Sequence, residues 1–205
     1  MGLNFSYNIY VKKNKLRDTL KLISENCSKR NNHIEQKNDN FYFVRMFYSD
    51  SFQGEIQTQK EILDDVLNSK ISLSCSLRFT FDDKILNYIH HQSREKINPN
   101  DSNSWKPPFY IDEKFEIGNF DLTFKDSTKI FPETIQVSFT ANTSDMSRLI
   151  KESTVINKFF KFFCKKVNAR YGYLDKEHEG FRLIWFEEKE YNIDFLDKTS
   201  LFKKS

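Results

Sequence analysis

The alternation of apolar and polar positions is clearest between residues 71 and 81. Over this stretch every second residue is apolar, and the residues between them are serine, arginine and threonine. A period of two is typical of a strand with one buried and one solvated face. The same alternation at residues 3–11, 115–125 and 134–141 predicts three more strands. Gly118 predicts a kink or bulge in the second of these.

Other strand patterns add detail. Residues 41–48 are apolar on both sides, which is typical of a central strand covered on both faces. Residues 171–175 and 181–186 flank a turn that closes at Gly180, so they predict a hairpin. The charged tail after residue 187 still contains aromatic and aliphatic side chains, and we expect it to dock on the rest of the protein.

Helices are expected where apolar residues recur every three to four positions. Residues 14–27 and 83–91 show this spacing, and residues 55–68 show a weaker version of it. A longer helical region extends over residues 143–169, and a Ser-Thr pair at Ser153 predicts that it restarts there.

The interleaving of these elements predicts an α+β fold. We expect a mostly antiparallel sheet with helices packed on one face, and the first six main elements allow a ferredoxin-like β-α-β-β-α-β unit. Residues 1–205 are expected to form a single α+β domain. Two sheet-sharing halves, 1–92 and 115–205, joined by the long loop 93–114, remain the alternative. A loop of this length is typical of a lid, a binding loop or disorder.

Composition narrows the class of protein. Among 205 residues there are 21 Phe, enough for a substantial core. The 32 basic against 29 acidic residues leave a net charge of only +3, which argues against a nucleic-acid partner. Cys27, Cys75 and Cys164 are odd in number and far apart, so we interpret them as reduced, buried thiols. No export signal or membrane span is visible, and we expect a cytoplasmic protein.

Signatures of catalysis are missing from the sequence. With 5 Gly there is no glycine-rich phosphate loop, and no motif for a nucleophile or a metal stands out, so no cofactor and no metal is expected. His90 and His91, at the predicted end of a helix, are either a C-terminal cap or a binding site. Asp82 and Asp83 fit a helix start, with an acid-base pair as the alternative. The cluster at 175–179 fits a solvated turn, with a cation site as the alternative.

Two segments are better candidates for recognition. Plotted as a helix, residues 155–167 bury one broad apolar face and turn a basic face outward. The outward residues are Lys158, Lys161 and Lys165, with Phe162 at the border. Such a surface suits single-stranded nucleic acid, an acidic protein or simply solvent. The second segment is the aromatic and proline-rich part of the long loop, which suits an interface or a lid. It includes Trp105, Phe109 and Tyr110.

The segment Phe139-Thr-Ala-Asn-Thr-Ser-Asp-Met-Ser-Arg-Leu149 resembles a segment of bacterial proteins of unknown function. The opening Leu3-Asn-Phe-Ser-Tyr7 is similar to their N-termini. This resemblance implies a bacterial source and carries no catalytic residue with it.

Two functions therefore remain open. The preferred one is a non-enzymatic cytosolic interaction module, an immunity-type or regulatory protein that binds a protein partner or a second copy of itself. The alternative is a small-ligand-binding protein or enzyme with its site near His90, His91 and the 93–114 loop. No membrane partner is expected.

Overall fold

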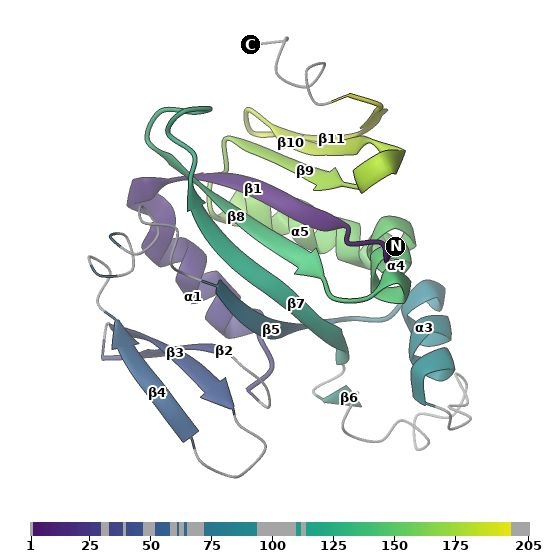
Figure 1. The fold of residues 1–205 in the computed structure, drawn as a ribbon, viewed down its shortest axis with the longest axis horizontal. Helices are drawn as coiled ribbons and strands as arrows, with labels where there is room; N and C mark the ends of the chain where they lie inside the picture. The colour runs from purple at the N-terminus through teal and green to yellow at the C-terminus, as the bar shows by residue number, and fades with distance from the viewer. Residues whose placement is uncertain are drawn as a thin grey trace.

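The structure, a computed structural model, describes residues 2–29, 33–38, 40–46, 52–57, 61, 64, 72–93, 110–111 and 114–197. It is an α+β fold with an eight-stranded antiparallel sheet and a separate three-stranded sheet (Figure 1). The large sheet contains β1 (Ser6–Lys12), β5 (Ser72–Phe79), β6 (Tyr110–Ile111), β7 (Lys114–Asp126), β8 (Thr134–Ala141), β9 (Tyr171–Asp175), β10 (Phe181–Phe186) and β11 (Lys189–Phe195). The small sheet contains β2 (His33–Lys37), β3 (Asn40–Met46) and β4 (Phe52–Gln57). The helices are α1 (Leu16–Asn26), α3 (Asp83–Ser93), α4 (Ser144–Glu152) and α5 (Thr154–Lys166).

Most of the predicted elements are confirmed. Strands β8, β9 and β10 have the expected bounds, and the helical region is broken at Ser153, which caps α5 by accepting a hydrogen bond from the Ile156 N–H. Gly118 has a φ of 112°, and the pairing of β5 with β7 shifts register beside it. The register shift is the bulge that the isolated glycine predicted, and the positive φ is one that glycine adopts without strain.

Two expectations need correction, and a third, the docking of the tail, is confirmed. The strand predicted at 41–48 is central, but it is β3, the middle strand of the small sheet, so the first six elements do not form one ferredoxin-like sheet. Residues 52–57 form β4, although part of this segment was expected to be helical. The tail docks as a full strand, β11, paired with β10. In each case the choice of hydrogen-bonding partner, which local periodicity does not report, decides the outcome.

Strand β1 lies in the middle of the large sheet, between β8 and β9. Tyr7 is paired with Phe139 on one side and with Leu174 on the other, and both ladders are antiparallel. The strand order is β11-β10-β9-β1-β8-β7-β5, with β6 paired to β7. The ranges 1–92 and 115–205 therefore both supply strands to one sheet.

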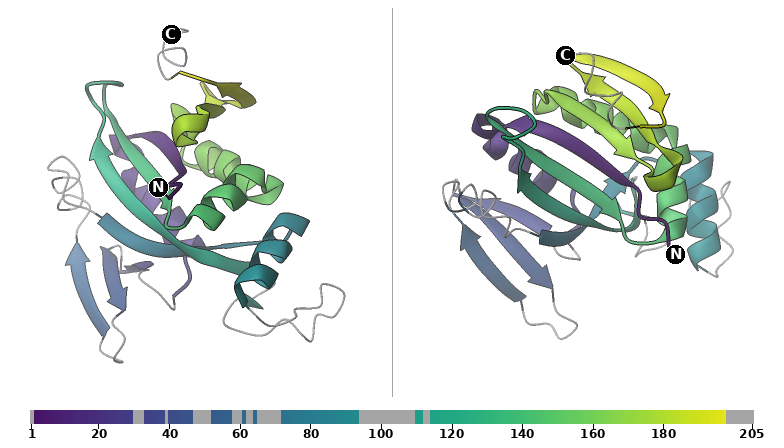
Figure 2. Two further views of the ribbon diagram at one scale, coloured as in Figure 1. Left: turned by 45° about the vertical axis from the view of Figure 1, so that its right-hand side comes forward. Right: turned by 45° about the horizontal axis from the view of Figure 1, so that its top comes forward.

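Helices α1 and α5 cover one face of the large sheet (Figures 1 and 2). The Tyr7 ring stacks on Phe160 of α5 with centroids 3.9 Å apart. Phe139 packs edge-on against the Phe160 ring, with centroids 5.2 Å apart. Phe163 is buried beside them. Each such phenylalanine contributes about 2–3 kcal/mol through burial. No helix among the described residues is long and apolar enough to span a membrane.

The opposite face of the sheet has a smaller aromatic core and a polar network. Tyr10, Tyr171, Tyr173 and Phe131 pack together there and are all buried. Beside them the buried Asn8 Oδ1 accepts hydrogen bonds at 2.6 and 2.7 Å from side chains of β8. The donors are Gln136 and Ser138.

Asp82 joins two helices through one carboxylate. Its Oδ1 accepts a hydrogen bond from the Ile85 N–H (2.9 Å), which caps α3. Its Oδ2 accepts from the Val155 N–H (3.2 Å) and the Ser153 hydroxyl (2.7 Å) at the start of α5. Burial alone would raise the pKa of Asp82, but these hydrogen bonds outweigh burial and hold the pKa below its ordinary value. Asp82 is thus a structural cap, as the helix-start interpretation predicted.

Replacing Asp82 by Ala should lower the free energy of unfolding by about 2 kcal/mol, because two helix starts lose their acceptor at once. The matched control is Asp83→Ala, which removes only an exposed first-turn acid and should cost about 0.5 kcal/mol. Urea unfolding of the three proteins measures the difference. Equal losses for the two variants would show that Asp82 does not bridge the helices.

The lowered pKa of Asp82 also predicts a pH dependence. The folded pKa is below the unfolded one, so the stabilisation is complete above about pH 4 and is lost as the pH falls through the folded pKa. Asp82→Asn should therefore lose less stability than the natural sequence on acidification. Parallel acid unfolding curves for the two proteins would contradict this assignment.

The turn between β10 and β11 carries backbone strain. Phe186 pairs with Lys189, so Glu187 and Glu188 form a two-residue loop, with φ values of 44° and 64°. Both are in the left-handed region that favours Asn and Gly. Glu188→Gly should raise the free energy of unfolding by about 1 kcal/mol. Glu188→Ala removes the same charge but keeps Cβ, so thermal unfolding should show no comparable gain. An equal gain in both variants would instead point to relief of charge repulsion.

Candidate functional site

A groove lies between α3 and α4 and brings several sequence candidates together. The α4 helix begins at Thr143, whose hydroxyl oxygen accepts a hydrogen bond from the Met146 N–H at 3.2 Å. At one end of the groove Lys84 of α3 donates to Glu152 of α4 at 2.9 Å. At the other end Gln92 lies 3.4 Å from Asp145. These contacts show that α3 and α4 pack side by side and antiparallel.

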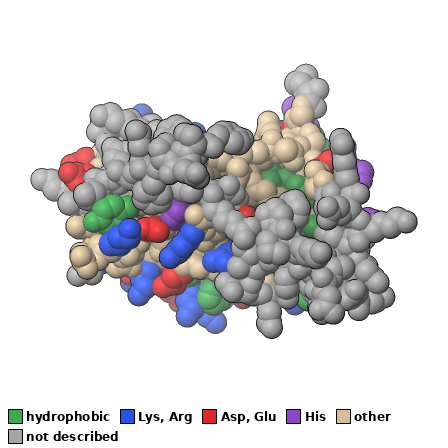
Figure 3. Space-filling view, turned by 90° about the horizontal axis from the view of Figure 1, so that it is seen from below, with side chains coloured by type: hydrophobic (Ala, Val, Ile, Leu, Met, Phe, Trp, Pro, Cys, Tyr) green, Lys and Arg blue, Asp and Glu red, His purple; other side chains and the backbone are tan. Residues whose placement is uncertain are grey.

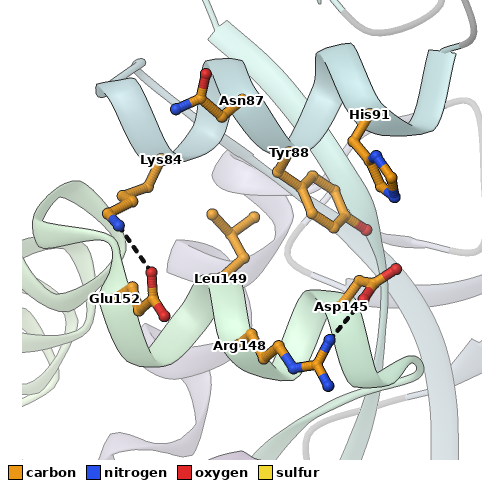
Figure 4. A pocket seen from close by; sticks show the side chains of 8 residues that line it. All are labelled: Lys84, Asn87, Tyr88, His91, Asp145, Arg148, Leu149 and Glu152. Atoms are coloured by element: carbon orange, nitrogen blue, oxygen red, sulfur yellow. Dashed lines mark hydrogen bonds and ion pairs between the residues drawn. The ribbon is translucent and has the colours of Figure 1, made fainter.

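The groove encloses about 280 Å³. Its lining comprises Lys84, Asn87, Tyr88 and His91 from α3, and Asp145, Arg148, Leu149 and Glu152 from α4 (Figure 4). Leu149 is buried and Tyr88 is half-buried, so the base of the groove is apolar. Burial raises the pKa of Tyr88, and a hydrogen bond with Thr143 only partly offsets this effect. Charged groups surround this base.

The two adjacent histidines have different surroundings. Helix α3 continues to Ser93, so His90 and His91 point in directions about 100° apart. Both are exposed, but only His91 lines the groove, where its ring lies on the same side as Asp145 (Figure 4). The structure thus brings one of the two predicted histidines next to a carboxylate.

The outer face of α5 keeps the predicted basic character. Lys158, Phe162 and Lys165 are exposed, and 45% of Phe162 is accessible. The Lys166 ammonium lies 5.4 Å from the centre of the Phe162 ring, within the range of a cation–π contact. Lys161 differs, because it is half-buried and lies 4.0 Å from Glu190 of β11. The exposed stripe is therefore Lys158, Phe162, Lys165 and Lys166.

The predicted aromatic loop is described only from Tyr110 onward. Trp105 and Phe109 lie outside the described residues. Tyr110 begins β6 and its backbone pairs with Phe115 of β7. The role expected for this loop stays a prediction.

The acidic cluster at 175–179 is a turn. Asp175 Oδ1 accepts from the Glu177 N–H at 2.9 Å, a short 3-10 helix spans Glu177–Glu179, and Gly180 follows with a φ of 84°. Glu179 pairs with Lys151 of α4. No group of three or more metal-ligating side chains occurs among the residues that the structure describes. The predicted turn is confirmed, with His178 and Glu179 exposed on it and Lys176 buried.

Sequence reasoning did not identify a second cleft, of about 450 Å³, between the end of α1, β2 and β5. Arg78 lines it together with Glu35, whose Oε1 lies 3.2 Å from the buried His33 ring. A hydrogen bond from Lys37 lowers the pKa of Glu35; burial opposes this effect and the contact with His33 adds to it. Basic and acidic side chains, with a histidine among them, also lie side by side on the face seen in Figure 3. The polar stretch before residue 41 carried no pattern that could have indicated this cleft.

All three cysteines are buried free thiols, as expected. The structure adds that Cys27, at the end of α1, contacts Cys75 of β5. A hydrogen bond between the Cys27 and Cys75 thiols, together with burial, raises the pKa of Cys75. Cys27 is positioned by a backbone bridge to Leu77. Two thiols 48 positions apart in sequence thus share one part of the core.

Lys176 follows β9 and is almost fully buried. Its ammonium donates to Asp194 Oδ1 at 2.9 Å, and Arg182 donates to the same oxygen at 3.1 Å. Burial would raise the pKa of Asp194, but the two basic partners hold it below its ordinary value. Asp194→Asn should lower the free energy of unfolding by about 2 kcal/mol, because it leaves a buried ammonium without its counter-ion.

The control for this change is Asp121→Asn, because Asp121 is an exposed carboxylate of β7 without an ion pair among the described residues. It should change the free energy of unfolding by less than about 0.5 kcal/mol. Chemical denaturation measures both. If Asp194→Asn behaved like the control, Lys176 would not depend on Asp194.

Comparison with known proteins adds no further assignment: no protein-family model, no curated protein and no solved structure matches this chain.

Proposed function

We propose that this protein is a non-enzymatic interaction module, of the immunity-type or regulatory class, that binds an acidic surface of a protein partner through the outer face of α5. The observation that carries the proposal is Phe162, which is 45% exposed in the middle of a lysine stripe. Lys158 and Lys165 are exposed and make no ion pair among the described residues, so their charges are available to a partner.

The arrangement has the physical features of a binding surface. An aromatic side chain supplies most of the energy of an interface when it is desolvated, and surrounding charges supply specificity and speed of association. The opposite side of α5 is rigidly held, because Phe160 and Phe163 are buried against the sheet. The backbone that carries Phe162 is therefore fixed before a partner binds, and little conformational entropy would be lost on binding. The four lysines of α5 favour an acidic partner.

The enzyme alternative receives less support from the geometry. In the α3–α4 groove the acids and bases are paired with one another, Asp145 with Arg148 at 3.3 Å and Glu152 with Lys84 at 2.9 Å. A general acid or base normally has a proton-transfer partner in the substrate, and paired surface carboxylates are poorly suited to this role.

Part of the large sheet and its two covering helices also suggest a fold assignment. We infer a ferredoxin-like unit that differs from the one expected from the first six elements. It comprises β1, α1, β7, β8, α5 and β9, which occur in this order in the chain; the segment between α1 and β7 and the helix α4 between β8 and α5 are additions to it. Two facts support this: the four strands lie in the order β9-β1-β8-β7, and α1 and α5 share one core. Each helix thus connects two parallel strands with another strand between them.

The test of the proposed interface uses a photo-crosslinking residue at position 162 in the natural host. The expected product joins the protein to an acidic segment of one partner. With that partner purified, Phe162→Ala and Lys158→Glu/Lys165→Glu should each weaken binding at least about tenfold, measured by calorimetry.

The matched control is Lys125→Glu/Lys129→Glu, two exposed lysines on and beside β7, which should leave the affinity unchanged. Binding should also weaken as salt is raised. Equal losses in both double variants, or a crosslink to nucleic acid, would overturn the proposal.

A further inference from the structure

We infer that the α3–α4 groove is a binding site for a small organic carboxylate, held by Arg148 and His91 over an apolar base. This site is separate from the α5 face and does not depend on the function proposed for that face. Figure 4 shows the helices contributing side chains to the groove from both sides.

The first step of the argument is the supply of unused hydrogen-bond donors. The Arg148 guanidinium has five N–H donors, and its only contact among the described residues is with Asp145 Oδ1 at 3.3 Å. The Arg148 side chain is 65% exposed, so its remaining donors are accessible. Neither His91 nor the Asn87 amide has a hydrogen bond or ion pair among the described residues, and both line the groove. His91 and the Arg148 guanidinium lie toward the Asp145 end of the groove, one on each helix (Figure 4).

The second step concerns charge. The two carboxylates of the groove are already engaged, Asp145 by Arg148 and Gln92, and Glu152 by Lys84. Their charges are therefore largely compensated before any ligand arrives. An arginine that keeps free N–H groups is suited to a planar, two-oxygen anion, because the guanidinium fork matches the carboxylate geometry. A carboxylate ligand would complete the hydrogen bonding of Arg148 without removing Asp145.

The third step is the shape and polarity of the base. Leu149 is only 5% exposed, and the Tyr88 ring is half-buried beside it. A groove of about 280 Å³ with such a base accommodates a small apolar group. Together with the donors at the rim, these features specify a ligand with a compact aromatic or branched apolar body and one carboxylate. Inorganic phosphate, which has no apolar body, would leave the base uncovered.

The experiment is an NMR titration of the full-length, isotope-labelled protein with sodium benzoate. The expected result is a saturable shift of the Arg148 Nε–H and His91 ring signals. Arg148→Ala should weaken benzoate binding at least about tenfold, and Arg148→Lys should weaken it by a smaller factor because the charge remains but the fork is lost. Because Arg148 is mostly exposed, both variants are expected to fold, which the amide spectrum verifies.

The controls separate this site from a general affinity for anions. Lys125→Ala, at an exposed lysine of β7, should leave the benzoate titration unchanged. Inorganic phosphate should produce a clearly weaker response at the groove. Shifts that do not saturate, an Arg148→Ala variant that binds as well as the natural sequence, or phosphate binding as tight as benzoate binding would each overturn the inference. None of these results depends on whether the α5 face binds a protein partner.

Discussion

Burial of the phenylalanine face of α5 against the large sheet is the interaction on which the rest of the structure depends. Phe160 contacts Tyr7 of β1, Phe139 of β8 and Phe120 of β7, so one side chain packs over three strands. The chain leaves β8, passes through α4 and α5, and returns as β9 on the other side of β1. This connection is stable only if α5 covers the strands that it crosses, and aromatic burial supplies that stabilisation.

A second constraint orients the remaining helices relative to α5. Asp82 accepts hydrogen bonds from the beginnings of α3 and α5, and Ser153 connects α4 to the same carboxylate. The three helix ends therefore meet at one point. The N-terminal segment is attached to α4 as well, because Ser147 exchanges hydrogen bonds with Leu3 and Phe5. The α3–α4 groove lies between two of the helices that meet there.

The two candidate surfaces lie on helices, whereas the face of the sheet without α1 and α5 buries the tyrosine cluster around Tyr10. On that face polar atoms such as Asn8 Oδ1 satisfy one another within the protein. On the helical side, in contrast, Phe162 and Arg148 retain exposed area or unused donors. Recognition is therefore assigned to side chains whose contacts the fold leaves incomplete, and the protein interface and the carboxylate site are distinguished by chemistry as well as position.

Local sequence patterns by themselves determined much of the secondary structure of this protein. The bounds of β8, the break at Ser153 and the two sides of α5 all follow from periodicity and capping, because these features depend on residues within one or two turns of each other. The double capping role of Asp82 did not follow, although its position at a helix start did. Only one of its helix partners is a neighbour in sequence.

Tertiary structure alone decided which strands pair and which side chains meet. The position of β1 between β8 and β9, the separate sheet around β3 and the docking of β11 are choices among partners far apart in the chain. His91 became a groove residue only because α4, more than fifty positions later, packs against α3. Periodicity states which face of an element is buried, but not against what, because the free energy of burial is nearly the same for many apolar partners.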